Sequence, residues 1–166
     1  MTIIPLDIKL SRNDRISLTG LIVISIVLLL TTANYNIEPL LSFQKSEIYK
    51  QLTGYLLFYF IGYQWYFALS RRKPVSSAQN KLYIHKITGL LMPVLLFIHA
   101  MQSGYAYQTL IWGMFITHCI VGVLNPDLLR FKRRSLRFYW FILHIILSIM
   151  VSGLLFYHLY VVYYYT

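Results

Sequence analysis

The chain of 166 residues is 58% hydrophobic and carries five acidic residues against fifteen lysines and arginines, for a formal net charge of +10. This composition is typical of an integral membrane protein and excludes an ordinary soluble domain. The charge does not indicate a nucleic-acid-binding protein, because the basic residues lie between apolar segments and not along a polar folded face. Cys119 is the one cysteine, so the sequence offers neither a disulfide framework nor a cysteine-rich metal cluster.

The first predicted membrane helix covers about residues 17–33, an uncharged segment long enough to span a bilayer. A cleaved signal peptide is the alternative, since a basic start, an apolar stretch and residues 31–33 loosely fit that pattern. We interpret the segment as a retained anchor. The polar residues 34–47 contain Pro39 and predict a loop.

Four further apolar segments predict membrane helices at about residues 49–69, 82–101, 106–124 and 138–162. The first of these ends at the charged sequence Arg71-Arg72-Lys73-Pro74. Pro93 lies inside the next one and is tolerated in a packed membrane helix. The sequence therefore predicts an all-α fold, a membrane helical bundle of about five transmembrane helices that forms a single domain over residues 1–166.

The basic residues predict how this bundle is oriented. Thirteen of the fifteen precede the first helix or lie in the second-to-third and fourth-to-fifth connections, and only Lys45 and Lys50 fall on the other side. The positive-inside rule then gives a cytoplasmic N-terminus and an external or periplasmic C-terminus. Aromatic clusters at residues 138–141 and 157–165 predict belts at the two interfaces. Compact size and the lack of a long targeting segment favour a bacterial inner membrane, with lipid as the surrounding partner.

Two histidine pairs share one interval. His85 and His99 lie 14 residues apart in the third predicted helix, and His144 and His158 lie 14 apart in the fifth. At about 1.5 Å and 100° per residue, each pair occupies one helix face about 21 Å apart. The predicted topology makes the two helices parallel, so His85 is level with His144 and His99 with His158. Imidazoles on both faces of a porphyrin iron are an ordinary ligation, and we predict two b-type haems on these pairs.

Two small residues are weaker candidates at the predicted inner haem. Gly89 and Ser148 each follow an inner histidine by four residues and would give a haem ring room to approach. Simple helix packing explains them equally well. His118 stands alone in the fourth predicted helix, where packing or hydrogen bonding is favoured over ligation, and a place near a haem edge or quinone head is the alternative.

Several polar side chains are candidates for binding haem propionates. Those on the inner side are Lys81, Lys86, Arg133, Arg134 and Arg137, and those on the outer side are Lys45, Lys50, Gln102 and Gln108. Enforcing membrane topology is the alternative role for the inner basic residues.

The later part of the chain resembles the ferric reductase-like transmembrane domain. The resemblance rests on Arg133-Arg134, an aromatic-rich turn, His144 and His158, together with His85 and His99 two helices earlier. This superfamily of dihaem cytochromes b includes ferric reductases, NADPH oxidases and the haem subunit of the bacterial methionine sulfoxide reductase system. The resemblance covers mainly residues 81–160 and implies that the four paired histidines are axial ligands of two stacked haems.

The sequence also departs from that superfamily. A typical member has six helices, and the oxidases and eukaryotic reductases continue into a flavin and nicotinamide domain. This sequence predicts a stand-alone five-helix version and contains no glycine-rich nucleotide motif. We therefore expect electrons to arrive from a separate protein or from membrane quinol.

The expected function is that of a membrane electron-transfer subunit, the haem subunit of an oxidoreductase, without catalytic side chains of its own. It would relay electrons from quinol or a partner reductase to an external acceptor through two haems, and a bound quinone is a further candidate cofactor. A cytochrome b subunit that anchors a dehydrogenase or hydrogenase is the nearest alternative. A small transporter whose histidines relay protons or bind metal, and an assembly subunit with incidental histidines, are alternatives from other classes.

Overall fold

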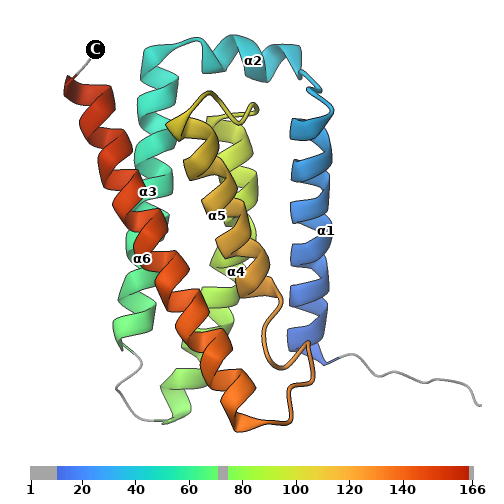
Figure 1. The fold of residues 1–166 in the computed structure, drawn as a ribbon. Helices are drawn as coiled ribbons and strands as arrows, with labels where there is room; N and C mark the ends of the chain where they lie inside the picture. Colours follow the sequence, from blue (N-terminus) through green and yellow to red (C-terminus); the bar gives the residue numbers. More distant parts are fainter. Residues whose placement is uncertain (1–10, 71–74, 165–166) are drawn as a thin grey trace, which may run out of the picture.

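The computed structural model describes residues 11–70 and 75–164, with the backbone alone for residues 75–79, and this part of the chain contains helices and no strands. The helices are α1 (Arg12–Thr32), α2 (Glu38–Gln44), α3 (Glu47–Leu69), α4 (Val75–His99), α5 (Tyr107–Val123) and α6 (Arg134–Tyr164) (Figure 1). The predicted all-α fold is confirmed, and the five long helices coincide with the five apolar segments. Helix α4 begins at Val75, about two turns before the predicted residue 82, because apolar composition identifies the membrane segment but not the polar first turns of its helix.

The loop predicted at residues 34–47 is wrong in part, because it contains helix α2. Pro39 lies in the first turn of α2, where its missing N–H has no intrahelical acceptor to lose and its fixed φ suits a helix. Proline therefore begins this helix and does not prevent it. Helix α2 lies across one end of the bundle and connects α1 to α3 (Figure 1).

The long helices alternate in direction. Helices α1, α4 and α6 run one way and α3 and α5 the other, which makes α4 and α6 parallel (Figure 1). The extensive helix contacts join α1 to α4 and α5, α4 to α3 and α5, and α5 to α6. Helix α6 is thus attached to the bundle mainly through α5, and α4 and α6 are not among the extensively packed pairs.

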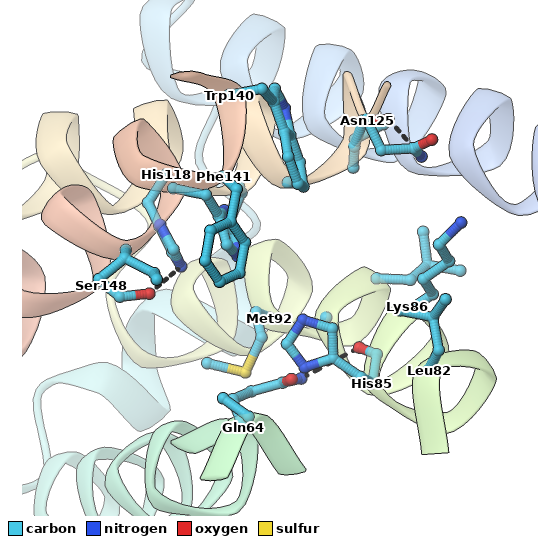
Figure 2. A pocket seen from close by; sticks show the side chains of 18 of the residues that line it. Gln64, Leu82, His85, Lys86, Met92, His118, Asn125, Trp140, Phe141 and Ser148 are labelled. Carbon is cyan, nitrogen blue, oxygen red and sulfur yellow. Dashed lines mark hydrogen bonds between the residues drawn. The ribbon is translucent and has the colours of Figure 1, made fainter. Parts of the chain in front are cut away.

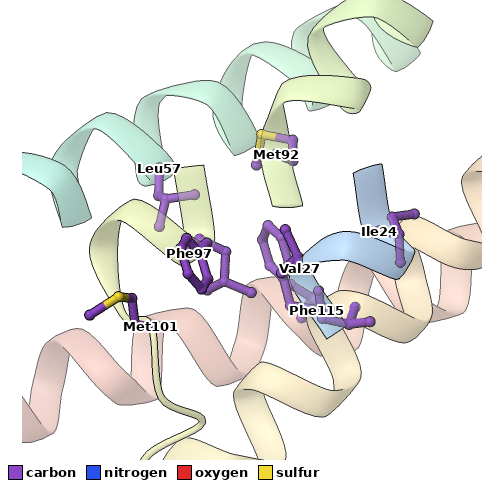
Figure 3. Packing of buried hydrophobic residues seen from close by; sticks show 10 residues of the cluster. Ile24, Val27, Leu57, Met92, Phe97, Met101 and Phe115 are labelled. Atoms are coloured by element: carbon purple, nitrogen blue, oxygen red, sulfur yellow. The ribbon is translucent and has the colours of Figure 1, made fainter. Parts of the chain in front are cut away.

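The hydrophobic core lies mainly among α1, α3, α4 and α5 (Figure 3). Its buried members are Ile24, Val27, Leu57, Met92, Leu96, Phe97, Met101, Phe115, Ile116 and Val151. Only Val151 comes from α6. Burial of such side chains contributes roughly 1.5–3 kcal/mol each, and most of this contribution within the cluster comes from the four other long helices.

The outer surface is strongly apolar. Leu29, Ile149 and Phe156 are 67%, 57% and 62% exposed, as are many other large apolar side chains. Among the described residues, three helices are long and apolar enough to cross a membrane: α1, residues 80–99 of α4, and α6. Helix α5 is apolar but has 17 residues, at the lower limit for a span, and α3 is not among the three.

Most lysines and arginines that the structure describes lie toward the end of the bundle where α1, α4 and α6 begin. Lys45 and Lys50 lie at the opposite end, beside α2. At the basic end, Arg130 Nη2 lies 3.3 Å from Asp14 Oδ2 and joins the connection before α6 to the start of α1. Residues of the predicted basic side that fall outside the described residues are Lys9, Arg71, Arg72 and Lys73.

The predicted aromatic belts are largely at the surface. Phe138, Tyr139 and Phe141 are exposed at the basic end of α6, and Tyr157, Tyr160, Tyr163 and Tyr164 are exposed toward its other end. Trp140 differs from this prediction because it is half-buried, and Tyr165 lies outside the described residues.

Candidate functional site

The structure brings the four paired histidines together across the space between α4 and α6. The ring centres of His85 and His144 lie 6.4 Å apart, and those of His99 and His158 lie 6.5 Å apart. The rings are nearly perpendicular in both pairs, at 84° and 88°. All four side chains are half-buried. We call His85 and His144 the inner pair, nearer the basic end, and His99 and His158 the outer pair.

These separations suit two imidazoles on opposite sides of one metal ion. A metal–imidazole nitrogen bond is about 2.0–2.1 Å and the ring centre lies about 1.2 Å beyond the nitrogen, which puts the two ring centres about 6.4 Å apart. Ordinary edge-to-face aromatic pairs span about 4.5–7 Å, so the distance alone does not distinguish the two arrangements. The surroundings of the pairs must decide between them.

A cavity of about 730 Å³ adjoins the inner pair (Figure 2). Ligand pockets typically measure about 300–1,000 Å³, so its size suits a cofactor. All five long helices contribute to its wall, and its lining is mostly apolar. Residues singled out from the sequence that line it are His85, His144, His118, Gly89, Ser148, Lys86 and Arg137. The two rings of the inner pair therefore line a cavity, whereas a contact in a packed core would be surrounded by other side chains.

The His144 ring packs between neighbouring rings, in space that a glycine leaves open. The Trp140 ring is nearly parallel to the His144 ring, at 5° with centres 5.3 Å apart, and the His118 ring lies 4.5 Å away at 18°. A Cβ at Gly122 would lie 3.3 Å from His144 Cε1, so the absence of a side chain there makes room for the imidazole. Trp140 Nε1 donates to the Val121 carbonyl at 3.0 Å, which fixes the indole against α5.

His118 is held by a hydrogen bond and stacking. Its Nε2 lies 3.3 Å from Ser148 Oγ (Figure 2), and its ring lies against that of His144. These contacts agree with the packing and hydrogen-bonding role favoured from the sequence. They also place His118 beside the inner pair, where the alternative role near a haem edge would put it.

A threonine hydroxyl orients His99. Thr53 Oγ1 lies 3.0 Å from His99 Nδ1 and donates its own proton to the Tyr49 carbonyl at 2.8 Å. Because a hydroxyl has one proton to give, the oxygen accepts from His99 Nδ1–H, and the lone pair is then on Nε2. The next residue, Gly54, leaves room for the ring, since a Cβ there would lie 3.2 Å from His99 Cε1. A fixed tautomer of this kind is what metal-ligating histidines usually have.

The other predicted polar candidates separate into two groups. Lys86 and Arg137 line the cavity beside the inner pair. Lys81 donates instead to the Ser70 carbonyl at the end of α3. On the outer side, Gln102 donates to Asn36 and Gln108 accepts from the Tyr105 amide, so each bonds to a residue of a connection between helices.

Within the part of the chain that the structure describes, no three His, Cys, Asp or Glu side chains gather as a metal site. A site built from the protein alone would need such a cluster. A haem iron needs only two protein ligands, because the porphyrin supplies the rest.

The chain was also compared with known proteins. No protein-family model, no curated protein and no solved structure matches it.

Proposed function

We propose that the protein is a membrane-embedded electron-transfer subunit that carries two b-type haems and relays electrons across the bilayer. The observation that supports this best is the repetition of one geometry: two histidine pairs, at two levels of the same two parallel helices, with equal separations. Unrelated packing contacts would have no reason to repeat at a common interval. The same pattern underlies the resemblance to ferric reductase-like domains, which we retain as part of the proposal.

The cavity and the two rings of the inner pair fit a haem, and the ring separation of the outer pair fits a second one. His85 and His144 would hold the inner haem and His99 and His158 the outer one, while Lys86 and Arg137 would bind inner propionates. The haems, when bound, supply the one-electron chemistry. The chain supplies a mostly apolar cavity beside the inner pair, the Thr53 hydroxyl that sets the tautomer of His99, and the ring stack that fixes His144.

The proposal includes five membrane spans with the basic end in the cytoplasm. Electrons would enter from quinol or a partner reductase and leave to an acceptor on the external side. The apolar outer surface and the concentration of basic residues at one end support this placement. Helix α3 would span despite its polar aromatic residues, since neighbouring helices cover part of it.

An absorption spectrum with haem stoichiometry tests the proposal directly. The full chain purified in detergent should show a low-spin, bis-histidyl haem b spectrum with two haems per chain. A folded protein without pigment would contradict the proposal. Ion flux through liposomes in the absence of pigment would indicate the transporter alternative.

Thr53 allows a finer test at the outer pair. Thr53→Val removes the acceptor for His99 Nδ1–H and should lower the affinity for the outer haem by about 10- to 100-fold, the usual cost of losing such a partner. Thr53→Ser keeps the hydroxyl and should retain the haem. Haem content and a redox titration of the outer centre measure both effects. Equal behaviour of the valine and serine variants would contradict the assigned role of the hydroxyl.

A further inference from the structure

His99 differs from the other three paired histidines in its place on its helix. It is the last residue of α4, whereas His85 lies ten residues inside α4 and both histidines of α6 are followed by further helical turns. The last four carbonyls of a helix have no intrahelical donor, and helix ends fray unless other groups satisfy them. A ligand at this position needs support that a ligand inside a helix does not.

Gln44 is the last residue of α2, and its side chain forms hydrogen bonds with the backbone groups at the end of α4. Its Nε2 donates to the Phe97 carbonyl at 3.1 Å and to the Ile98 carbonyl at 2.9 Å. Its Oε1 accepts from the Met101 amide at 3.3 Å. One carboxamide thus bonds the backbone on both sides of His99.

This contact is closed to water. Gln44 is 9% exposed and Met101 is 2% exposed, and Phe97 and Met101 belong to the hydrophobic core (Figure 3). The Tyr49 hydroxyl also donates to the Ile98 carbonyl at 3.2 Å, and Thr31 Oγ1 donates to the Met101 carbonyl at 3.1 Å. Without the Gln44 amide, the Phe97 carbonyl would lose its donor in a place where solvent cannot replace it.

We propose that Gln44 is a positioning residue for the outer haem, which holds the end of α4 so that His99 stays in register with His158. Helix α2 presents this side chain, because it lies across the bundle at the end where α4 stops (Figure 1). The inference rests on the proposed function and assigns to α2 a purpose that its sequence did not suggest. It also predicts that substitutions of Gln44 affect the outer haem and not the inner one, since neither His85 nor His144 lies at a helix end.

The test measures both haems in the same molecule. Gln44→Met keeps the length of the side chain and removes its hydrogen bonds, and Gln44→Glu keeps the shape but loses the amide donor. Both variants should lower the affinity for the outer haem at least about fivefold, the effect of leaving one buried polar group unsatisfied. The inner haem should keep its content, potential and electron paramagnetic resonance signal. Gln51→Met changes an exposed glutamine of α3 that has no assigned role, and this control variant should retain both haems.

The outcomes separate this inference from the proposed function. A wild-type chain without haem would overturn both. A wild-type chain with two haems, together with an unchanged outer haem in Gln44→Met and Gln44→Glu, would overturn the inference alone. Equal loss of both haems would also overturn it, because that result would indicate a general folding role for Gln44 and not a positioning one.

Discussion

Replacing His144 with alanine is expected to remove the inner haem and to leave the outer one, so that haem content falls from two per chain to one. His85→Ala should give the same residual spectrum, because the centres of the two rings lie 6.4 Å apart and both would bind the same proposed haem. His99→Ala and His158→Ala should give a second, different residual spectrum, that of the inner haem alone. Haem extraction and low-temperature spectra measure these results.

The control for this series is His118→Ala. His118 lies against His144 and bonds Ser148, so its loss should disturb the inner centre without removing it. Loss of the inner haem in His118→Ala would mean that the ligand assignment is wrong. Residual spectra that group His85 with His158 would contradict the pairing.

Adding side chains at Gly54 and Gly122 is expected to remove one haem each while the fold persists. A Cβ at either position would lie 3.2–3.3 Å from an imidazole carbon of His99 or His144. Alanine should have a modest effect, whereas valine should displace the ring. Overpacking costs about 1–3 kcal/mol, which corresponds to about a 5- to 150-fold loss of haem affinity. Gly54→Val should affect the outer haem and Gly122→Val the inner one, as measured by haem titration.

The same helices provide the controls. Gly62 in α3 and Gly113 in α5 have nothing within 4 Å of an added Cβ, so Gly62→Ala and Gly113→Ala should retain both haems. Retention of both haems in Gly54→Val and Gly122→Val would show that the imidazoles do not need these positions. Loss of both haems in the alanine controls would show that these helices tolerate no added side chain, and the effects of Gly54→Val and Gly122→Val would then not be specific to the histidines.

Much of the fold could be predicted from sequence because its determinants are local. The apolar segments predicted the five long helices, and the distribution of basic residues among the connections predicted their alternating directions. The interval of 14 residues put two histidines on one face of each helix, the predicted parallel direction of the two helices paired them by level, and the structure brings together the residues so paired. Helix α2 was missed because a proline was treated as a helix breaker without regard to its position in the first turn.

The supports around the histidines could not be predicted because they depend on distant contacts. Thr53 precedes His99 by 46 residues, and Gln44 precedes Ile98 by 54. Amphipathic pattern does not say which face of α3 meets α4 when most faces are apolar. Trp140 was placed in an interfacial belt on composition, yet its ring lies on His144. The signals in the sequence were the adjacent Thr53 and Gly54, and Trp140 one turn before His144, and their meaning becomes clear only once the histidine that each contacts is known.

The sparse contact between α4 and α6 gives the proposed haems a mechanical role. Each would act as a cross-link between two helices whose backbones are not extensively packed together, and α6 contributes Val151 alone to the buried core cluster. Binding of the proposed haems would then stabilise the folded chain by mass action. A ligand present at about 1,000 times its dissociation constant adds about 4 kcal/mol to the free energy of unfolding. Without the proposed haems α6 would be held mainly through α5, so the supply of the cofactor would affect the lifetime of the protein as well as its activity.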